Sequence, residues 1–442
     1  MKEALNNKNF ILKQDFNERL ISRLLLIIEK IISFVMTAFM ASRLSYKDIG
    51  FWSQVIFSAS LFTSLVGFNI PNGIIAIVPR INKSEEKYEF IFKSFLFIFL
   101  TGLIFSLILL FFKESISNIL FNKILNLNIF ILILIIGFSE LLLEFVLYSF
   151  RSIKDFSFAN FIIILRIMPR LFAFAGILIN DINLIINIYS TTFILSCITI
   201  FLFLYRRYSF KIIFLLRKKL NLFLSPKPYI QSLFSLSRKS VLATLIASLF
   251  FFFVRTITLS NMGLEGVGQF SLAISAGATI LSLTTLIGFT FYPYISNKAI
   301  NEKYIAYQKT RKLSLNLIYF SILIPFILVM LKLLFKNDFN FYPFTINSTD
   351  LFLAFLGYGF LGAYQLSQPF AFALTDNINV FKIEIISSLI SLSLIFIIFL
   401  VDNFSIHFAI LSFCVYSFFN YLQANRRNFK ILKDNTSYEF PL

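Results

Sequence analysis

Charged residues, cysteine and histidine are scarce in this chain of 442 residues. Asp, Glu, Lys and Arg together make up 14% of the sequence, whereas a soluble domain has about 25%. The two cysteines, Cys197 and Cys414, lie inside apolar segments without metal-ligand spacing, which excludes a disulfide scaffold and a cysteine-bound metal. The only histidine, His407, has no recognisable nucleophile or base to act with, and there is no phosphate-binding glycine loop. We therefore expect no enzyme, no cofactor and no metal site.

Apolar residues dominate instead, at 58% of the chain, and the mean hydropathy is +0.82. The net charge of +18 would indicate a nucleic-acid partner in a soluble protein, but this apolarity excludes a nucleic-acid-binding module and a cytosolic enzyme. The apolar runs are continuous rather than alternating, and about 20 residues cross a bilayer as a helix. The sequence predicts an all-α polytopic membrane protein with about twelve transmembrane helices. The predicted spans are 20–44, 51–79, 90–112, 128–150, 158–180, 184–205, 236–262, 267–295, 314–335, 351–374, 383–401 and 406–424.

Lys and Arg are distributed unequally between the two sides of this predicted bundle. With the N-terminus in the cytoplasm, the cytoplasmic tails and loops contain 26 of them, and the opposite loops contain four. Cytoplasmic loops of membrane proteins are enriched in Lys and Arg. We therefore expect both termini in the cytoplasm. All the outer loops are short, and the longest are 113–127 and 336–350.

The longest predicted loop divides the helices into two sets of six. The predicted domains are an N-terminal six-helix lobe, a basic cytoplasmic linker, a C-terminal six-helix lobe and a cytoplasmic tail, at 1–205, 206–235, 236–424 and 425–442. Two stretches, 48–53 and 265–271, have similar glycine, aromatic and serine positions and open corresponding helices of the two halves. This similarity favours a parallel repeat of the kind found in membrane transporters.

Ionisable residues deep inside the predicted spans are candidates for the transport pathway, because charges in a bilayer are costly. Glu140 and Glu144 share a face of one helix, and Arg166 and Arg170 share a face of the next. Two interpretations stay open. In the first, the four residues form a ladder of ion pairs, Glu144 with Arg166 and Glu140 with Arg170. In the second, the arginines face a central cavity. Both interpretations can hold together, because a buried arginine usually needs a partner even while it binds a ligand.

Other deep cations favour an anionic, phosphate-bearing ligand. Lys30 lies near mid-membrane on the first helix, and Arg23 lies on the same face towards the cytoplasm. Arg255 has no acid within its own helix, and guanidinium groups suit phosphate. Amide side chains on other spans are suited to sugars. The substrate-binding residues predicted from the sequence are Arg23, Lys30, Arg166, Arg170, Arg255, Asn69, Gln365 and Gln368.

The segment 41–52 resembles the start of a known transporter family. Its sequence is similar to the "ARxLxxxxxG-x-aromatic" opening of bacterial Wzx-type flippases for O-antigen and capsule repeat units, with Ser42 in place of Ala before Arg43. The stretch 265–271 is similar to the "xxVGxYSxA" stretch of that family, with Phe270 in place of Tyr and Ala273 matching. These flippases are part of the multidrug/oligosaccharidyl-lipid/polysaccharide exporter superfamily.

The resemblance implies two six-helix lobes around a cavity that opens alternately to the two sides of the bacterial inner membrane. It implies a role in lipopolysaccharide or other polysaccharide biosynthesis, with an undecaprenyl-diphosphate-linked oligosaccharide as substrate and cationic residues at its diphosphate. Membrane lipid, a polysaccharide polymerase and chain-length machinery are the implied partners. A drug or metabolite exporter of the same superfamily stays open because of Glu29, Glu140 and Glu144. An O-antigen polymerase is disfavoured because that enzyme needs a large outer loop.

Overall fold

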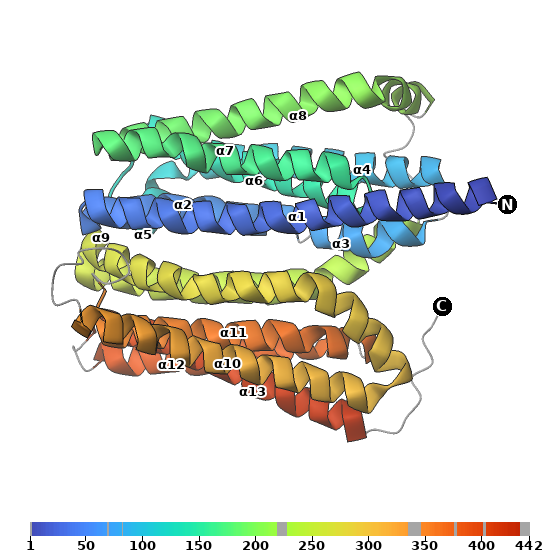
Figure 1. The fold of residues 1–442 in the computed structure, drawn as a ribbon. Helices are drawn as coiled ribbons and strands as arrows, with labels where there is room; N and C mark the ends of the chain where they lie inside the picture. Colours follow the sequence, from blue (N-terminus) through green and yellow to red (C-terminus); the bar gives the residue numbers. More distant parts are fainter. Residues whose placement is uncertain are drawn as a thin grey trace. The chain divides into compact units, whose positions relative to one another are not determined.

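The computed structural model describes residues 2–68, 70–81, 83–218, 228–334, 346–374, 378–400 and 404–433. All regular secondary structure in these ranges is helical, which confirms the predicted all-α class. Figure 1 shows the α-helices in chain order. They are α1 (Lys2–Arg43), α2 (Tyr46–Gly67), α3 (Ile70–Ile77), α4 (Ser84–Phe111), α5 (Lys113–Phe121), α6 (Leu127–Ser152), α7 (Phe156–Ile179), α8 (Ile182–Lys218), α9 (Pro228–Asn301), α10 (Lys303–Leu334), α11 (Ser348–Leu374), α12 (Ile378–Leu400) and α13 (Ile406–Lys433), with a 3-10 turn at Val78–Arg80.

Helices form along these segments because a bilayer offers no partner for backbone N–H and C=O groups, and a helix satisfies them internally. Among the described residues, nine helical stretches are long and apolar enough to cross a membrane. One of them, Leu245–Thr284, extends over two predicted spans, 236–262 and 267–295. The predicted spans 351–374 and 383–401 coincide with α11 and α12.

Two predicted boundaries differ from the structure. The predicted span 51–79 is divided into α2 and α3, because Phe68 adopts a φ of 45° and ends the first helix. The predicted outer loop 113–127 contains the short helix α5. Hydropathy detects the long apolar runs on both sides of it but not a helix of nine mixed residues. Gln54 of α2 ties α5 in place, since its Nε2 donates to Leu120 O at 2.6 Å.

The long helix α9 changes direction at a glycine. Gly263 has φ 65° and ψ −166°, a combination that is essentially restricted to glycine. No atom lies within 4 Å of the place where a Cβ would be added. The glycine is therefore required by the backbone conformation rather than by lack of space.

Contacts divide the chain into two compact units. Unit 1 comprises Met1–Ser33 and Gln54–Val241, and unit 2 comprises Phe34–Ser53 and Leu242–Leu442. In unit 1, α6 packs against α3, α4, α7 and α8 (Figure 1). It has buried residues along its whole length. In unit 2, α11 packs between α10 and α13. The lobes predicted at 1–205 and 236–424, with their linker and tail, stay a prediction.

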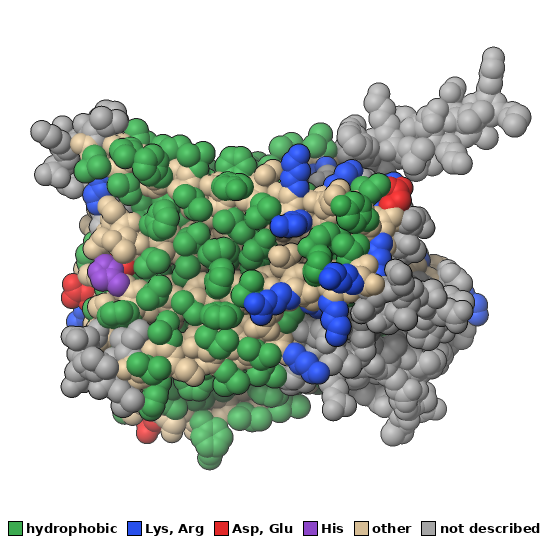
Figure 2. Space-filling model, turned by 90° about the horizontal axis from the view of Figure 1, so that it is seen from below, with side chains coloured by type: hydrophobic (Ala, Val, Ile, Leu, Met, Phe, Trp, Pro, Cys, Tyr) green, Lys and Arg blue, Asp and Glu red, His purple; other side chains and the backbone are tan. Residues whose placement is uncertain are grey.

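Cations and apolar residues are segregated along α10 and α13 of unit 2. The first third of α10 and the last turns of α13 present exposed Lys309, Lys312, Arg426 and Lys430, and α10 then continues with exposed apolar side chains from Leu315 onwards. A face seen in Figure 2 has the same arrangement, with apolar side chains over its middle and Lys and Arg towards one end. This pattern is typical of helices that leave the apolar part of a bilayer at a basic end.

Candidate functional site

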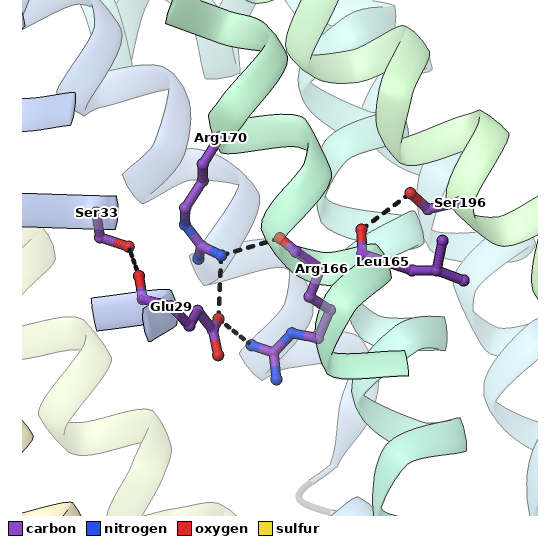
Figure 3. Close-up of polar contacts among 6 residues, drawn as sticks. All are labelled: Glu29, Ser33, Leu165, Arg166, Arg170 and Ser196. Carbon is purple, nitrogen blue, oxygen red and sulfur yellow. Dashed lines mark hydrogen bonds and ion pairs between the residues drawn. The ribbon is translucent and has the colours of Figure 1, made fainter. Parts of the chain in front are cut away.

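Three charged side chains from two helices meet in the interior of unit 1. Arg170 Nη1 of α7 lies 3.0 Å from Glu29 Oε1 of α1, and Arg166 Nη2 lies 3.6 Å from the same oxygen (Figure 3). Arg170 Nη1 also donates to Arg166 O at 3.0 Å, which holds its guanidinium against the helix. The sequence prediction that Arg166 and Arg170 lie on one face is consistent with this geometry. Their acidic partner is a residue of α1.

The Glu29 carboxylate is enclosed, whereas the two guanidinium groups remain partly accessible. The side chain of Glu29 is 4% exposed, and those of Arg166 and Arg170 are 19% and 18% exposed. A buried carboxylate without a partner is strongly unfavourable, so Glu29 requires the arginines. The arginines share one carboxylate and present five N–H donors each, so donors remain for a further acceptor.

A proline between the arginines shapes this part of α7. Pro169 lies inside the helix and has no N–H to donate to Leu165 O, four residues earlier. Ser196 Oγ of α8 donates to that carbonyl at 3.0 Å (Figure 3). The hydroxyl of the neighbouring helix therefore satisfies the acceptor that the proline leaves, as happens in other transmembrane helices.

The predicted ladder between Glu140, Glu144 and the two arginines is not formed. Neither glutamate lies within 4 Å of a nitrogen of Arg166 or Arg170 among the described residues, although both interact electrostatically with Arg166. Equal depth in a hairpin does not decide the pairing, because a carboxylate of a third helix, here Glu29 of α1, lies closer to both arginines. Glu140, Glu144 and Tyr148 instead form a half-buried stripe along α6, whose other faces are largely buried.

The cations of α1 differ from each other in exposure. Lys30 has an exposed side chain directly after the buried Glu29, and it interacts electrostatically with Glu29, Arg166 and Arg170. Arg23 is half-buried, and its Nε has no hydrogen-bond partner within the described residues. Glu29 belongs to the site but is not among the binding residues predicted from the sequence. Its position inside a predicted span, next to Lys30, could have indicated it.

Arg255 lies in unit 2 and belongs to a different cluster. Its Nη1 lies 3.3 Å from Ser53 Oγ, and its guanidinium carbon lies 5.8 Å from the ring centroid of Phe270. Ser271 Oγ donates to Ser53 Oγ at 2.8 Å. Ser53 and Ser271 are not among the site residues predicted from the sequence. They occupy corresponding places in the two similar stretches, and this correspondence could have indicated that they lie in one cluster.

The structure thus brings together only some of the predicted site residues. Arg166 and Arg170 meet at Glu29 in unit 1, with Lys30 next to it in sequence. Gln365 and Gln368 lie half-buried on α11 of unit 2. Asn69 lies outside the described residues. In the described part of the chain, no group of three or more His, Cys, Asp or Glu side chains is placed to hold a metal ion.

Solved structures of known proteins have the same architecture. No protein-family model and no curated protein sequence matches the chain. The lipid II flippase MurJ, in an inward closed conformation, superposes with a TM-score of 0.62 at 15% identity over 95% of this chain and 94% of MurJ. A MATE transporter in complex with MaL6 superposes with a TM-score of 0.61 at 12% identity, over 93% and 96% of the two chains. The chain therefore has the fold of these membrane transporters.

A third similar structure extends the range of functions among the proteins that share the fold. The MATE multidrug transporter DinF-BH, in a complex with a bound compound, has a TM-score of 0.56 and 15% identity, with 93% of this chain and 95% of that chain covered. The shared fold and the nine apolar stretches agree on a multi-pass membrane protein. Because lipid and drug transporters both have this fold, the fold by itself does not give a function.

Proposed function

We propose that this protein is a flippase for polyprenyl-diphosphate-linked oligosaccharides, in particular undecaprenyl-diphosphate-linked repeat units, in the bacterial inner membrane. The observation that carries the proposal is the pair of arginines that share Glu29 inside unit 1. Two adjacent guanidinium groups match the oxygens of a diphosphate, and their exposed fractions leave them accessible to one. The MurJ likeness supports a lipid-linked substrate.

In this proposal the chain is a transporter rather than an enzyme. Arg166 and Arg170 bind the diphosphate, Glu29 orients them when the site is empty, and Lys30 adds a cation whose side chain is already exposed. Arg23, one turn inside the predicted cytoplasmic boundary, is the first cation that an entering diphosphate meets. The two halves of the chain alternate between inward-open and outward-open arrangements, as transporters with repeated halves do. Surface-polysaccharide polymerase and chain-length machinery receive the translocated units.

The test is mass spectrometry of lipid-linked glycans in cells that lack this protein. We expect one undecaprenyl-diphosphate repeat unit to accumulate on the cytoplasmic side and the surface polymer to disappear. In this strain, a Lys30→Ala variant should still accumulate the repeat unit while reaching normal protein abundance, because the Lys30 side chain is exposed. The matched control is Lys430→Ala, which replaces an exposed cation near the end of α13. This variant should restore the polymer in cells that otherwise lack the protein. Unchanged glycans in the deleted strain would refute the proposal.

A drug or metabolite exporter is the second candidate, and one observation favours it. Glu140 and Glu144 are half-buried on α6 and form no ion pair with the arginines, so they are available to an amphiphilic cation. The MATE likenesses have the same fold. Unchanged lipid-linked glycans together with increased sensitivity of the deleted strain to cationic drugs would favour this function.

A further inference from the structure

Unit 2 contains a cavity that is lined by both polar and apolar side chains, none of which belongs to the arginine cluster of unit 1. Its volume is about 350 Å³, within the range of about 300–1,000 Å³ that is usual for small-molecule sites. The start of α2, the region of α9 around its kink at Gly263, and the first turns of α11 and α13 surround it. All four regions lie at the ends of helices that the Lys and Arg distribution assigns to the outer side. The polar lining residues are Tyr46, Gln269, Asn347, Asp350, Ser405 and His407.

A pair of titratable side chains forms one wall of this cavity. His407 Nδ1 lies 2.5 Å from Asp350 Oδ1. The Asp350 side chain is 9% exposed, whereas the His407 side chain is 46% exposed, so the pair has a buried carboxylate and an open imidazole edge. This contact leaves the second oxygen of Asp350 and Nε2 of His407 as the polar atoms of the pair that remain for a ligand.

Two amides complete the polar lining. The Gln269 side chain is half-buried and forms no hydrogen bond with the described residues. Asn347 Oδ1 accepts from Thr349 N at 3.1 Å at the start of α11, which leaves the Asn347 amide N–H groups as donors. The cavity therefore offers both donors and acceptors on several sides. Its apolar surface comes from Met262, Leu272, Ile346 and Ile406.

The charge of the lining selects the ligand. No Lys or Arg is among the described lining residues, so nothing there pairs with a phosphate. The one carboxylate among them is already paired with His407, so a free cation finds no unpaired acid. Carboxylate, amide, hydroxyl and imidazole groups together suit a neutral ligand with many hydroxyl groups. We propose that this cavity binds a sugar of the lipid-linked oligosaccharide at the outer end of unit 2.

This inference rests on the proposed flippase function and adds a second site to it. The cationic cluster of unit 1 recognises the diphosphate, which every lipid-linked glycan of this kind has in common. The neutral cavity of unit 2 recognises hydroxyl groups, whose arrangement differs from one glycan to another. Selectivity between glycans therefore resides in the cavity, and affinity for the lipid diphosphate resides in the arginines.

Equilibrium binding to the purified full-length protein in detergent micelles tests the assignment with two probes. One probe is the lipid-linked oligosaccharide extracted from cells that lack this protein, and the other is undecaprenyl diphosphate without sugar. Gln269→Ala with Asn347→Ser, in which serine keeps a cap for α11, should raise the Kd for the glycosylated lipid about 10-fold. The Kd for undecaprenyl diphosphate should stay within about twofold of the unmodified protein. Asn261→Ala, at an exposed residue of α9 outside the cavity lining, is the matched control and should change neither Kd.

The outcomes separate the two proposals. If the unmodified protein binds neither lipid, the flippase function and the sugar site both fail. If it binds both lipids and the double variant leaves both Kd values unchanged, the sugar site fails and the flippase function stands. Equal weakening of both lipids by the double variant would indicate a structural role for the two amides and would also overturn the sugar site. Selective loss of the glycosylated lipid supports it.

Discussion

Glu29 illustrates how one residue organises the interior of unit 1. A lone carboxylate is unfavourable in a bilayer, and its two arginines make it tolerable. The same contact keeps the two guanidinium groups close together, although they repel each other. In the proposed function this acid positions two cations for an anion. The ladder interpretation had instead paired the arginines with Glu140 and Glu144.

A double-mutant cycle measures this pairing. We expect Glu29→Gln and Arg170→Gln to couple by about 0.5–3 kcal/mol in the free energy of unfolding, because the residues are in direct contact. The readout is reversible unfolding of the purified protein in mixed micelles. The cycle of Glu140→Gln with Arg170→Gln is the control and should give coupling near zero, since no ion pair joins these two residues. A larger coupling for Glu140 than for Glu29 would restore the predicted ladder.

At the scale of elements, the start of α2 and the middle of α9 approach unusually closely in unit 2. A Cβ on Gly50 would overlap Leu264 O, and a Cβ on Gly268 would overlap Tyr46 O. Each glycine therefore gives the backbone of the other helix room to pass. Gly50 and Gly268 are equivalent positions of the two similar stretches, so the predicted repeat residues contact their own counterparts.

Gly268→Ala should separate these two helices. The added methyl group meets a backbone oxygen rather than a movable side chain. We therefore expect the free energy of unfolding to fall by about 1–3 kcal/mol. Ser260→Ala, at an exposed position of α9, is the control and should be nearly neutral. Thermal unfolding in detergent compares the two variants. Equal melting temperatures for Gly268→Ala and the unmodified protein would contradict the close contact.

At the scale of the whole molecule, orientation follows from charge. The basic residues of α10 and α13 lie at one end of these helices, and the Asp350–His407 pair lies at the opposite end of α13. The positive-inside distribution then predicts that the cavity of unit 2 opens to the outer side. This assignment determines on which side of the membrane the proposed sugar site opens.

Cysteine labelling checks the orientation. Both native cysteines, Cys197 and Cys414, are buried and should react little with a membrane-impermeant maleimide. We expect Asn261→Cys to be labelled in intact cells and Lys430→Cys to be labelled only after permeabilisation, since both positions are exposed at opposite predicted sides. Labelling in the reverse pattern would place the termini outside.

Much of the helical architecture could be predicted from hydropathy because a membrane span needs a long apolar run and little else. The break at Phe68 could not be predicted, since it lies inside an apolar run. The short helix α5 could not be predicted either, because its nine residues include Lys, Glu, Ser and Asn and are too few for a span. At the site, the i, i+4 spacing predicted that Arg166 and Arg170 share a face. Their partner Glu29 is 141 residues from Arg170 in the sequence, and spacing within a hairpin contains no information about it.

Composition, continuous apolar runs and the placement of Lys and Arg were sufficient to predict a polytopic helical membrane protein, because transfer of side chains into lipid depends on local sequence. Pairing of charges, the crossing of Gly50 with Gly268 and the cavity beside Asp350 depend on how distant helices pack. These features required the tertiary structure. The physical reason is that a buried charge or a close backbone contact is satisfied by whichever group lies next to it in space, and sequence distance does not measure that proximity.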